Sequence, residues 1–292
     1  MNKQSLKVYY VDSFTSKQFK GNPAGVVLHT DDLSVELMQK IAQEINLSET
    51  VFAKKANNYF VVRYFTRCQE IKFCGHATLA LAWVLGKKYN YVEIVDKLKF
   101  LSNVGEIIIN WEKKNNNLNK VFMKQVTPKI RQFTGNIGEL CKILGLSVND
   151  IDNKYPLKLA YTGNWDLFLP VKTSEIIKKI NPDMKKLKIH NISFNVVSTH
   201  LFSFNNQIIT RNFAPAVGID EDLVTGSSTG ALIGCLMLEK IISWDNHYLF
   251  IKQINSFNRE GIIYVKSKVD NGLSIYVGGK AVCTLEGLIN IR

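Results

Sequence analysis

Short apolar runs bounded by polar residues recur along most of the chain, which is typical of β-strands. The predicted strands cover residues 7–11, 25–28, 59–65, 106–111, 167–171, 192–197, 208–213, 262–265 and 274–277. Helical spacing of apolar residues is rarer. It occurs over residues 37–45, after Ser34, a residue type that caps helix N-termini, and over residues 137–144. The pattern predicts an α+β protein rich in strands.

Two further predicted helices begin at Gly75 and Gly226, and both are apolar nearly all round. A helix without a polar face must be buried on every side. We therefore expect a sheet to be wrapped around each of these helices.

The two apolar helices belong to an internal repeat. The first copy reads Arg63-Tyr-Phe and then Cys74-Gly-His-Ala-Thr, and the second reads Arg211-Asn-Phe and then Thr225-Gly-Ser-Ser-Thr. Each copy is a strand ending in Arg-x-Phe, a polar connector, a turn of small residues and the helix. The connector of the second copy is three residues longer. Matched motifs in the same order argue against a chance similarity.

The repeat predicts two pseudo-symmetric domains, each a curled, mostly antiparallel sheet around a central helix. We place the N-terminal domain at residues 1–117 and the C-terminal domain at residues 118–280. Residues 281–292 are expected to pack back on the first domain. The three asparagines at 115–117 are the best candidate for the crossing between the domains.

Composition and charge narrow the choice of partners. The 292 residues suit one large domain or two of about 150. The net charge is +12, and the clustered lysines are not interleaved with aromatic residues, so we expect no nucleic-acid partner. No apolar run approaches the roughly 18 residues that indicate a membrane span. The charge is best explained by a solvated basic surface.

The five cysteines are odd in number, and their spacing fits neither a disulfide framework nor a zinc site. A reducing, cytoplasmic location is the simplest interpretation. No cluster of His, Asp or Glu has the spacing of metal ligands, and no glycine-rich nucleotide motif follows a strand. We therefore expect neither a metal nor a cofactor.

The starts of the two apolar helices are candidate binding sites for an anion. A helix N-terminus offers unpaired N–H groups and a partial positive charge. Gly75 and Gly226 let the backbone approach a ligand closely, and the side chains of His76, Ser227 and Ser228 add hydrogen-bond donors. Two such ends facing one cleft would bind a carboxylate or an enolate from both sides. The alternative is that the Gly-Ser-Ser-Thr run only caps a helix.

Three further residues carry candidate chemistry. Glu49 precedes an apolar run, where a partly desolvated carboxylate is suited to proton transfer, although composition alone favours a solvated surface glutamate. Asp222 lies shortly before the second helix, where an acidic group is also favoured electrostatically. Cys74 suggests thiol chemistry, but its counterpart in the repeat is Thr225. A two-thiol racemase needs a thiol in each half, so the repeat argues against that reaction.

An ordered set of motifs across the chain resembles the phenazine-biosynthesis PhzF family. The matching stretches are Val11-Asp-Ser-Phe, Phe19-Lys-Gly-Asn-Pro-Ala, Leu47-Ser-Glu-Thr, Arg63-Tyr-Phe-Thr, Cys74-Gly-His-Ala-Thr, Arg211-Asn-Phe-Ala-Pro, Glu221-Asp-Leu-Val-Thr-Gly-Ser and Val277-Gly-Gly. Single pieces are weakly specific, whereas the ordered set is strong. The chain departs from the family pattern at Arg67, Leu223, Gly25 and Ser228-Thr229, which leaves the substrate open.

The resemblance implies the fold of diaminopimelate epimerase, with the site between two domains, a homodimer and no cofactor. It implies an isomerase that moves a proton between carbons of a small, carboxylate-bearing, amino-acid-like or cyclic substrate. The family's acid/base glutamate corresponds to Glu49, and its supporting residues correspond to His76, Asp222 and Ser227. The expected substrate-binding residues are Gly75, Ala77, Thr225, Gly226 and Ser228. The alternatives are a two-thiol epimerase and a non-catalytic metabolite-binding or interaction protein on the same fold.

Overall fold

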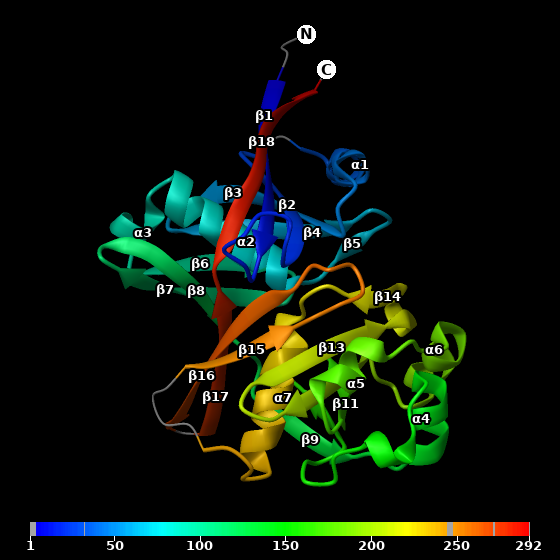
Figure 1. Cartoon of the computed structure of the whole chain (residues 1–292). Coiled ribbons are helices and arrows are strands. Elements are labelled where there is room, and N and C mark those ends of the chain that lie inside the picture. Colours follow the sequence, from blue (N-terminus) through cyan, green and yellow to red (C-terminus); the bar gives the residue numbers. More distant parts are fainter. Residues whose placement is uncertain (1–3, 32, 244–247, 271, 292) are drawn as a thin grey trace. The chain divides into compact units, whose positions relative to one another are not determined.

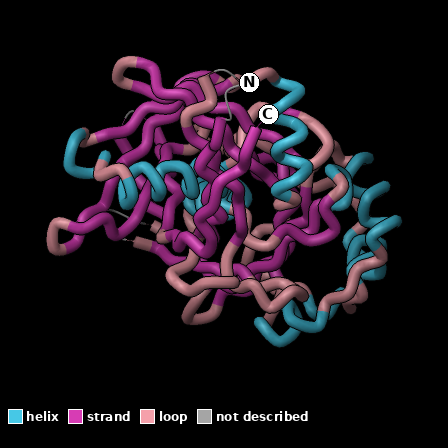
Figure 2. Tube along the Cα trace, turned by 90° about the horizontal axis from the view of Figure 1, so that it is seen from above, coloured by secondary structure: helices cyan, strands magenta, loops and turns pink. Residues whose placement is uncertain are grey.

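The computed structural model describes residues 4–31, 33–243, 248–270 and 272–291. These residues form two compact units. The first unit contains the chain up to Lys124 together with the residues from Gly278 onward, and the second contains Gln125–Val277. Strands dominate the chain, and helices are the smaller part (Figure 2). Among the described residues, no helix is long and apolar enough to cross a membrane.

The first unit is a curled sheet with three helices. Its elements are β1 (Gln4–Ser13), β2 (Asn22–Leu28), α1 (Val35–Ile45), β3 (Glu49–Ala56), β4 (Tyr59–Thr66), β5 (Glu70–Ile71), α2 (Gly75–Lys88), α3 (Tyr91–Ile94), β6 (Lys97–Ser102), β7 (Gly105–Lys114), β8 (Asn117–Lys124) and β18 (Ala281–Ile291). Along β18-β1-β2-β3-β4-β6-β7 the pairings are antiparallel, antiparallel, parallel, antiparallel, parallel and antiparallel.

The second unit repeats this arrangement. Its elements are β9 (Lys129–Gln132), α4 (Ile137–Leu144), η1 (Val148–Asp150), β10 (Lys158–Tyr161), β11 (Trp165–Pro170), α5 (Ser174–Lys179), α6 (Met184–Ser193), β12 (Ser198–Phe204), β13 (Ile208–Ala214), η2 (Pro215–Val217), β14 (Ile219–Asp222), α7 (Gly226–Leu238), β15 (Leu249–Gln253), β16 (Gly261–Asp270) and β17 (Gly272–Gly279). Along β9-β10-β11-β12-β13-β15-β16 the parallel and antiparallel pairings follow the same order as in the first unit. The predicted pseudo-symmetric α+β fold is confirmed.

The two apolar helices lie where the sequence pattern predicted them. Helix α2 packs against β1, β2, β3, β8 and β18, and α7 packs against β9, β10, β11 and β16 (Figure 1). Residues 79–82 of α2 and 231–233 of α7 are at most 1 % exposed. The glycines of α7 allow close packing, because a Cβ on Gly234 would lie 2.5 Å from the Pro128 side chain. Each sheet curls because it must cover a helix that has no polar face.

The other helical predictions also hold at their N-termini. Ser34 caps α1 by accepting a hydrogen bond from the Leu37 N–H. The apolar face of α1 packs on Phe52 and Phe65 in a buried cluster. Helix α4 is capped by Asn136 in the same way.

Two local predictions were wrong. Residues 192–197 are not a strand, because helix α6 continues to Ser193 and Asn195 turns the chain with a φ of +52°. Ile192, in the last turn of α6, has 58 % of its surface exposed. The strand begins at Ser198. Asn115 and Asn116 do not cross between units. They form the turn of the β7–β8 hairpin, with φ values of +51° and +60° that asparagine tolerates better than most residues. The chain passes between units after Lys124 instead.

Candidate active site

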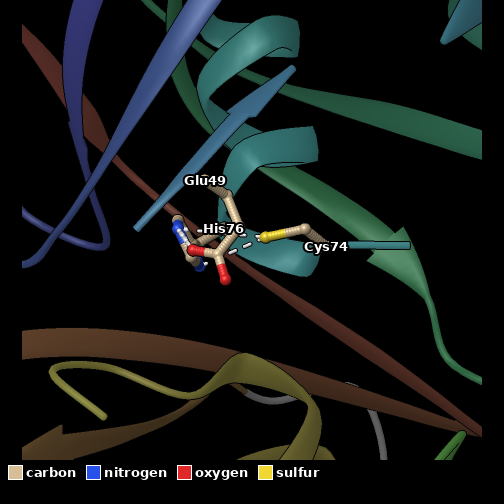
Figure 3. A group of neighbouring side chains, drawn as sticks. All are labelled: Glu49, Cys74 and His76. Atoms are coloured by element: carbon tan, nitrogen blue, oxygen red, sulfur yellow. Dashed lines mark hydrogen bonds and ion pairs between the residues drawn. The ribbon is translucent and has the colours of Figure 1, made fainter. Parts of the chain in front are cut away.

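Glu49 and His76 come together at the N-terminus of helix α2. Glu49 is the first residue of β3, and the pairing of β3 with its neighbours places it opposite Ala24 and Thr66. His76 is the second residue of α2. Its Nε2 atom lies 3.1 Å from Oε2 of Glu49, and both side chains are 10 % exposed. Figure 3 shows the two side chains facing each other, with the Cys74 sulfur beside the imidazole ring. The sheet register and the helix start therefore build a buried acid–base pair.

The pair is held as a carboxylate and an imidazolium. Burial works to raise the pKa of Glu49, but the adjacent His76 more than offsets this, so the pKa of Glu49 is lowered. Burial works to lower the pKa of His76, yet Cys74 and Glu49 raise it well above its ordinary 6.5. Burial raises the pKa of the Cys74 thiol, which therefore stays protonated. Glu49 is thus ionised and available as a base at neutral pH.

Cys74 contacts His76, but its thiol is buried and burial raises its pKa. Its Sγ lies 3.5 Å from Nδ1 of His76, and the residue is 7 % exposed. One donor atom from each of Glu49, Cys74 and His76 lies within 4.8 Å of the others, so the three could hold a metal ion. The sequence did not reveal this group because Glu49 lies on β3, far along the chain from Cys74 and His76 at the start of α2. Metal binding there would require deprotonation of a thiol whose pKa is raised, and it would engage the Glu49 carboxylate.

The second unit builds a different site at the start of α7. Thr225 is the N-cap residue, and Ser227 is the counterpart of His76. The Thr162 hydroxyl donates to the Ser227 carbonyl at 3.0 Å, as Ser13 donates to the His76 carbonyl at 2.8 Å in the first unit. Each helix start is therefore anchored by one hydroxyl group at the same position of the repeat.

The Arg-x-Phe motif of the repeat has a structural role. Arg63 forms a two-pronged ion pair with Glu70, seven residues later, and Arg211 forms the same pair with Glu221, ten residues later. In each copy the guanidinium lies over the ring of the motif's phenylalanine, 5.6 Å and 4.7 Å from its centre. The three inserted residues thus lie between the arginine and the glutamate. The number of residues from the glutamate to the start of the helix is the same in both copies.

Some predicted binding residues are occupied by contacts within the protein. The Ser228 hydroxyl donates to Asp166 at 2.7 Å, and Ser228 is 2 % exposed. The N–H of Thr225 donates to Gln253 and its hydroxyl donates to Asp222. Ala77 is fully buried, whereas Gly75, Gly226 and Ser227 are partly exposed. Binding by Ser228 and Thr225 side chains is therefore not favoured by the structure.

Sequence reasoning missed a second buried carboxylate, Asp166. The pairing of Thr199 with Phe213 matches that of Thr50 with Phe65, so Ser198 is the counterpart of Glu49. Asp166 on the neighbouring strand accepts hydrogen bonds from both Ser198 and Ser228, and burial raises its pKa to about 6. Its only sequence signal is a charged residue inside an apolar strand.

Comparisons with known proteins agree with this architecture. The phenazine biosynthesis-like protein family, PhzC-PhzF, matches residues 11–287. An uncharacterized isomerase of Clostridium acetobutylicum is 31% identical, over 96% of this chain and 96% of the relative. The trans-2,3-dihydro-3-hydroxyanthranilate isomerase of Pseudomonas chlororaphis is 32% identical, over 76% of each chain.

Solved structures show the same fold. The crystal structure of a PhzF-family phenazine biosynthesis protein from Bacillus anthracis has a TM-score of 0.89 and 28% identity, over 99% of this chain and 100% of the other. A hydroxyproline epimerase from Agrobacterium vitis shares the fold alone, with a TM-score of 0.65 and 9% identity, over 100% of this chain and 93% of the other.

The fold and the relatives define an isomerase with an epimerase-like architecture. The chain belongs to the phenazine biosynthesis-like PhzC-PhzF family.

Proposed function

We propose that this isomerase moves a proton between two carbons of a small, carboxylate-bearing substrate without a cofactor, and that Glu49 is the residue that carries the proton. The observation that supports this most is the buried pair of Glu49 and His76, 3.1 Å apart, at a helix N-terminus.

The proposed reaction needs a group that both accepts and returns a proton. The Glu49 carboxylate removes a proton from carbon as the C–H bond breaks, and the electron pair moves into the conjugated system of the substrate. Glu49, now a carboxylic acid, returns the proton to a second carbon. Bonds and electrons balance with no oxidant, and the product is an isomer. The His76 imidazolium keeps Glu49 ionised before the first transfer and stabilises negative charge on the substrate during it.

The substrate carboxylate is proposed to bind main-chain N–H groups at a partly exposed helix start, around Gly75 or around Gly226–Ser227. Helix N-termini favour anions there. Asp222 is proposed to bind a different part of the substrate. A two-thiol epimerase reaction is disfavoured, because Thr225 stands where the second thiol would be needed.

Replacement of Glu49 by glutamine tests the proposal. The amide is nearly isosteric but cannot take up and return the proton, so turnover should fall by about a hundredfold or more. Ligand affinity should stay within about tenfold. Since a relative is named for it, trans-2,3-dihydro-3-hydroxyanthranilate is the first substrate to assay, and a run in deuterium oxide should place deuterium at the receiving carbon unless the same proton is returned.

Glu106→Gln is the matched control, because Glu106 is exposed on β7. It should leave turnover unchanged. Wild-type turnover by the Glu49→Gln variant, on any compound that the native enzyme converts, would refute the role of Glu49.

A further inference from the structure

The Thr225 hydroxyl, at the position of Cys74 in the repeat, belongs to a buried hydrogen-bond network around Asp222. The network contains His200 on β12, Asn212 on β13, Thr225 before α7 and Gln253 on β15. His200 and Gln253 are fully buried, and Asn212 is 1 % exposed. The direction of the hydrogen bonds in this network follows from two groups, one that can only donate and one that can only accept.

The group that can only donate is the main-chain N–H of Thr225. It lies 2.9 Å from Oε1 of Gln253, so this oxygen is the acceptor and the amide orientation of Gln253 is determined. The amide nitrogen of Gln253 then donates to the Asp222 carbonyl at 2.9 Å and to the Thr225 hydroxyl at 3.3 Å. One lone pair of the hydroxyl is therefore occupied.

The remaining bonds orient the Thr225 hydroxyl toward Asp222. Its oxygen lies 2.5 Å from Oδ2 of Asp222, and a carboxylate can only accept, so the single hydroxyl hydrogen points there. Asn212, 3.0 Å away, must then present its N–H to Thr225. Its amide oxygen consequently faces Nδ1 of His200, 3.0 Å away, which must carry a hydrogen.

His200 is suited to this role because it stays neutral. Burial lowers its pKa to about 4, so the ring carries one hydrogen at neutral pH, and that hydrogen lies on Nδ1. The side-chain donors of His200, Asn212 and Thr225 thus form a chain that runs toward the Asp222 carboxylate, and none of them requires that carboxylate to donate in return.

We propose that Asn212, Thr225 and Gln253 are positioning residues that hold the Asp222 carboxylate as a hydrogen-bond acceptor for a hydroxyl or an amino group of the substrate. This inference rests on the proposed function in that it assigns Asp222 to substrate binding. It deepens that function, because it requires a substrate with a donor group in addition to its carboxylate. Thr225 acts through Asp222 and does not bind the substrate with its side chain.

Three aromatic acids measure the donor preference without turnover. Salicylate has a hydroxyl beside its carboxylate, anthranilate has an amino group, and benzoate has neither. Isothermal titration of the wild-type protein should show at least one of the first two binding about tenfold or more tightly than benzoate, as expected for a hydrogen bond to a charged group. The stronger of the two identifies the donor.

Thr225→Val removes the hydroxyl with little change in size, and Thr225→Ser retains it. Valine should reduce the preference over benzoate to about twofold or less, with benzoate affinity unchanged, and serine should restore the preference. Thr229→Val is the matched control, since Thr229 is buried in the same helix and its hydroxyl has no hydrogen-bond partner among the described residues. It should keep the wild-type preference.

Asp222→Asn separates positioning from a general structural effect. In that background Thr225→Val should cause no further loss of preference, because both changes act through one carboxylate. The inference is overturned if Thr225→Val retains the full preference, or if the wild type binds none of the three acids or shows no preference for a donor. These results do not depend on turnover, so they are distinct from failure of the Glu49→Gln test.

Discussion

The two Arg–Glu ion pairs of the repeat have the same geometry but differ in how deeply they are buried. In the second unit, the side chains of Arg211 and Glu221 are 6 % and 4 % exposed, whereas those of Arg63 and Glu70 in the first unit are 31 % and 24 % exposed. The bonding between the partners is the same in both units. Glutamate-to-glutamine changes in the two pairs should therefore differ mainly because of the surroundings.

Substitution in the buried pair should lower the free energy of unfolding more than substitution in the exposed pair. Arg211 also donates to the carbonyls of Ile177 and Ile180 at the end of α5, and Glu221 accepts from the N–H and hydroxyl of Ser256. Glu221→Gln leaves the guanidinium charge buried without a counter-charge, which costs about 3–5 kcal/mol. Because the amide oxygen still accepts one hydrogen bond, we expect the lower end of this range. Glu70→Gln disrupts a pair that is open to solvent, which costs about 0.2–1 kcal/mol.

Urea unfolding of the intact chain measures the difference. With a slope of about 2 kcal/mol per molar urea, Glu221→Gln should lower the midpoint by about 1.5 M and Glu70→Gln by less than about 0.5 M. Hydrogen exchange of β13 and β14 should rise in the first variant only. Equal losses of stability in the two variants would refute the argument that burial determines how much each Arg–Glu pair contributes to the free energy of unfolding.

Three further predictions concern the two sites. Cys74→Ala should retain substantial turnover, because the thiol is buried and protonated and has no partner thiol; a loss above about a thousandfold in a folded variant would restore a catalytic role for sulfur. Turnover should survive exhaustive dialysis against EDTA, and recovery of a lost activity by one metal would show that Glu49, Cys74 and His76 act as ligands. Burial raises the pKa of Asp166 from 3.8 to about 6, so the folded state retains this proton as the pH rises from 3.8 to 6 while the unfolded state releases it, and stability falls across that range. Asp166→Asn should therefore raise the unfolding free energy at pH 7 by up to about 3 kcal/mol but leave it unchanged near pH 3, and chemical denaturation that shows no such pH dependence would contradict the assignment.

The apolar pattern and the repeat were sufficient to predict much of the fold. Residues 75–88 and 226–238 are apolar nearly all round, and a helix of that kind can be stable in water only when it is enclosed. The repeat of Arg-x-Phe and a small-residue turn then required two similar units. The prediction at 192–197 failed because a helix end and a strand can have the same short run of apolar residues, and only packing decides between them.

The sequence by itself determined which residues are proposed to carry the chemistry, and the tertiary structure decided which of them lie together. Family motifs pointed to Glu49, His76, Asp222 and Ser227, but no local pattern shows that β3 brings Glu49 within 3.1 Å of His76. Nor does any pattern show that Thr225 directs its hydroxyl to Asp222. Such contacts depend on strand register and on the direction of each hydrogen bond, which link residues far apart in the chain. A sequence records residue types and spacing, whereas charge and hydrogen-bond direction depend on neighbours that only the folded chain assembles.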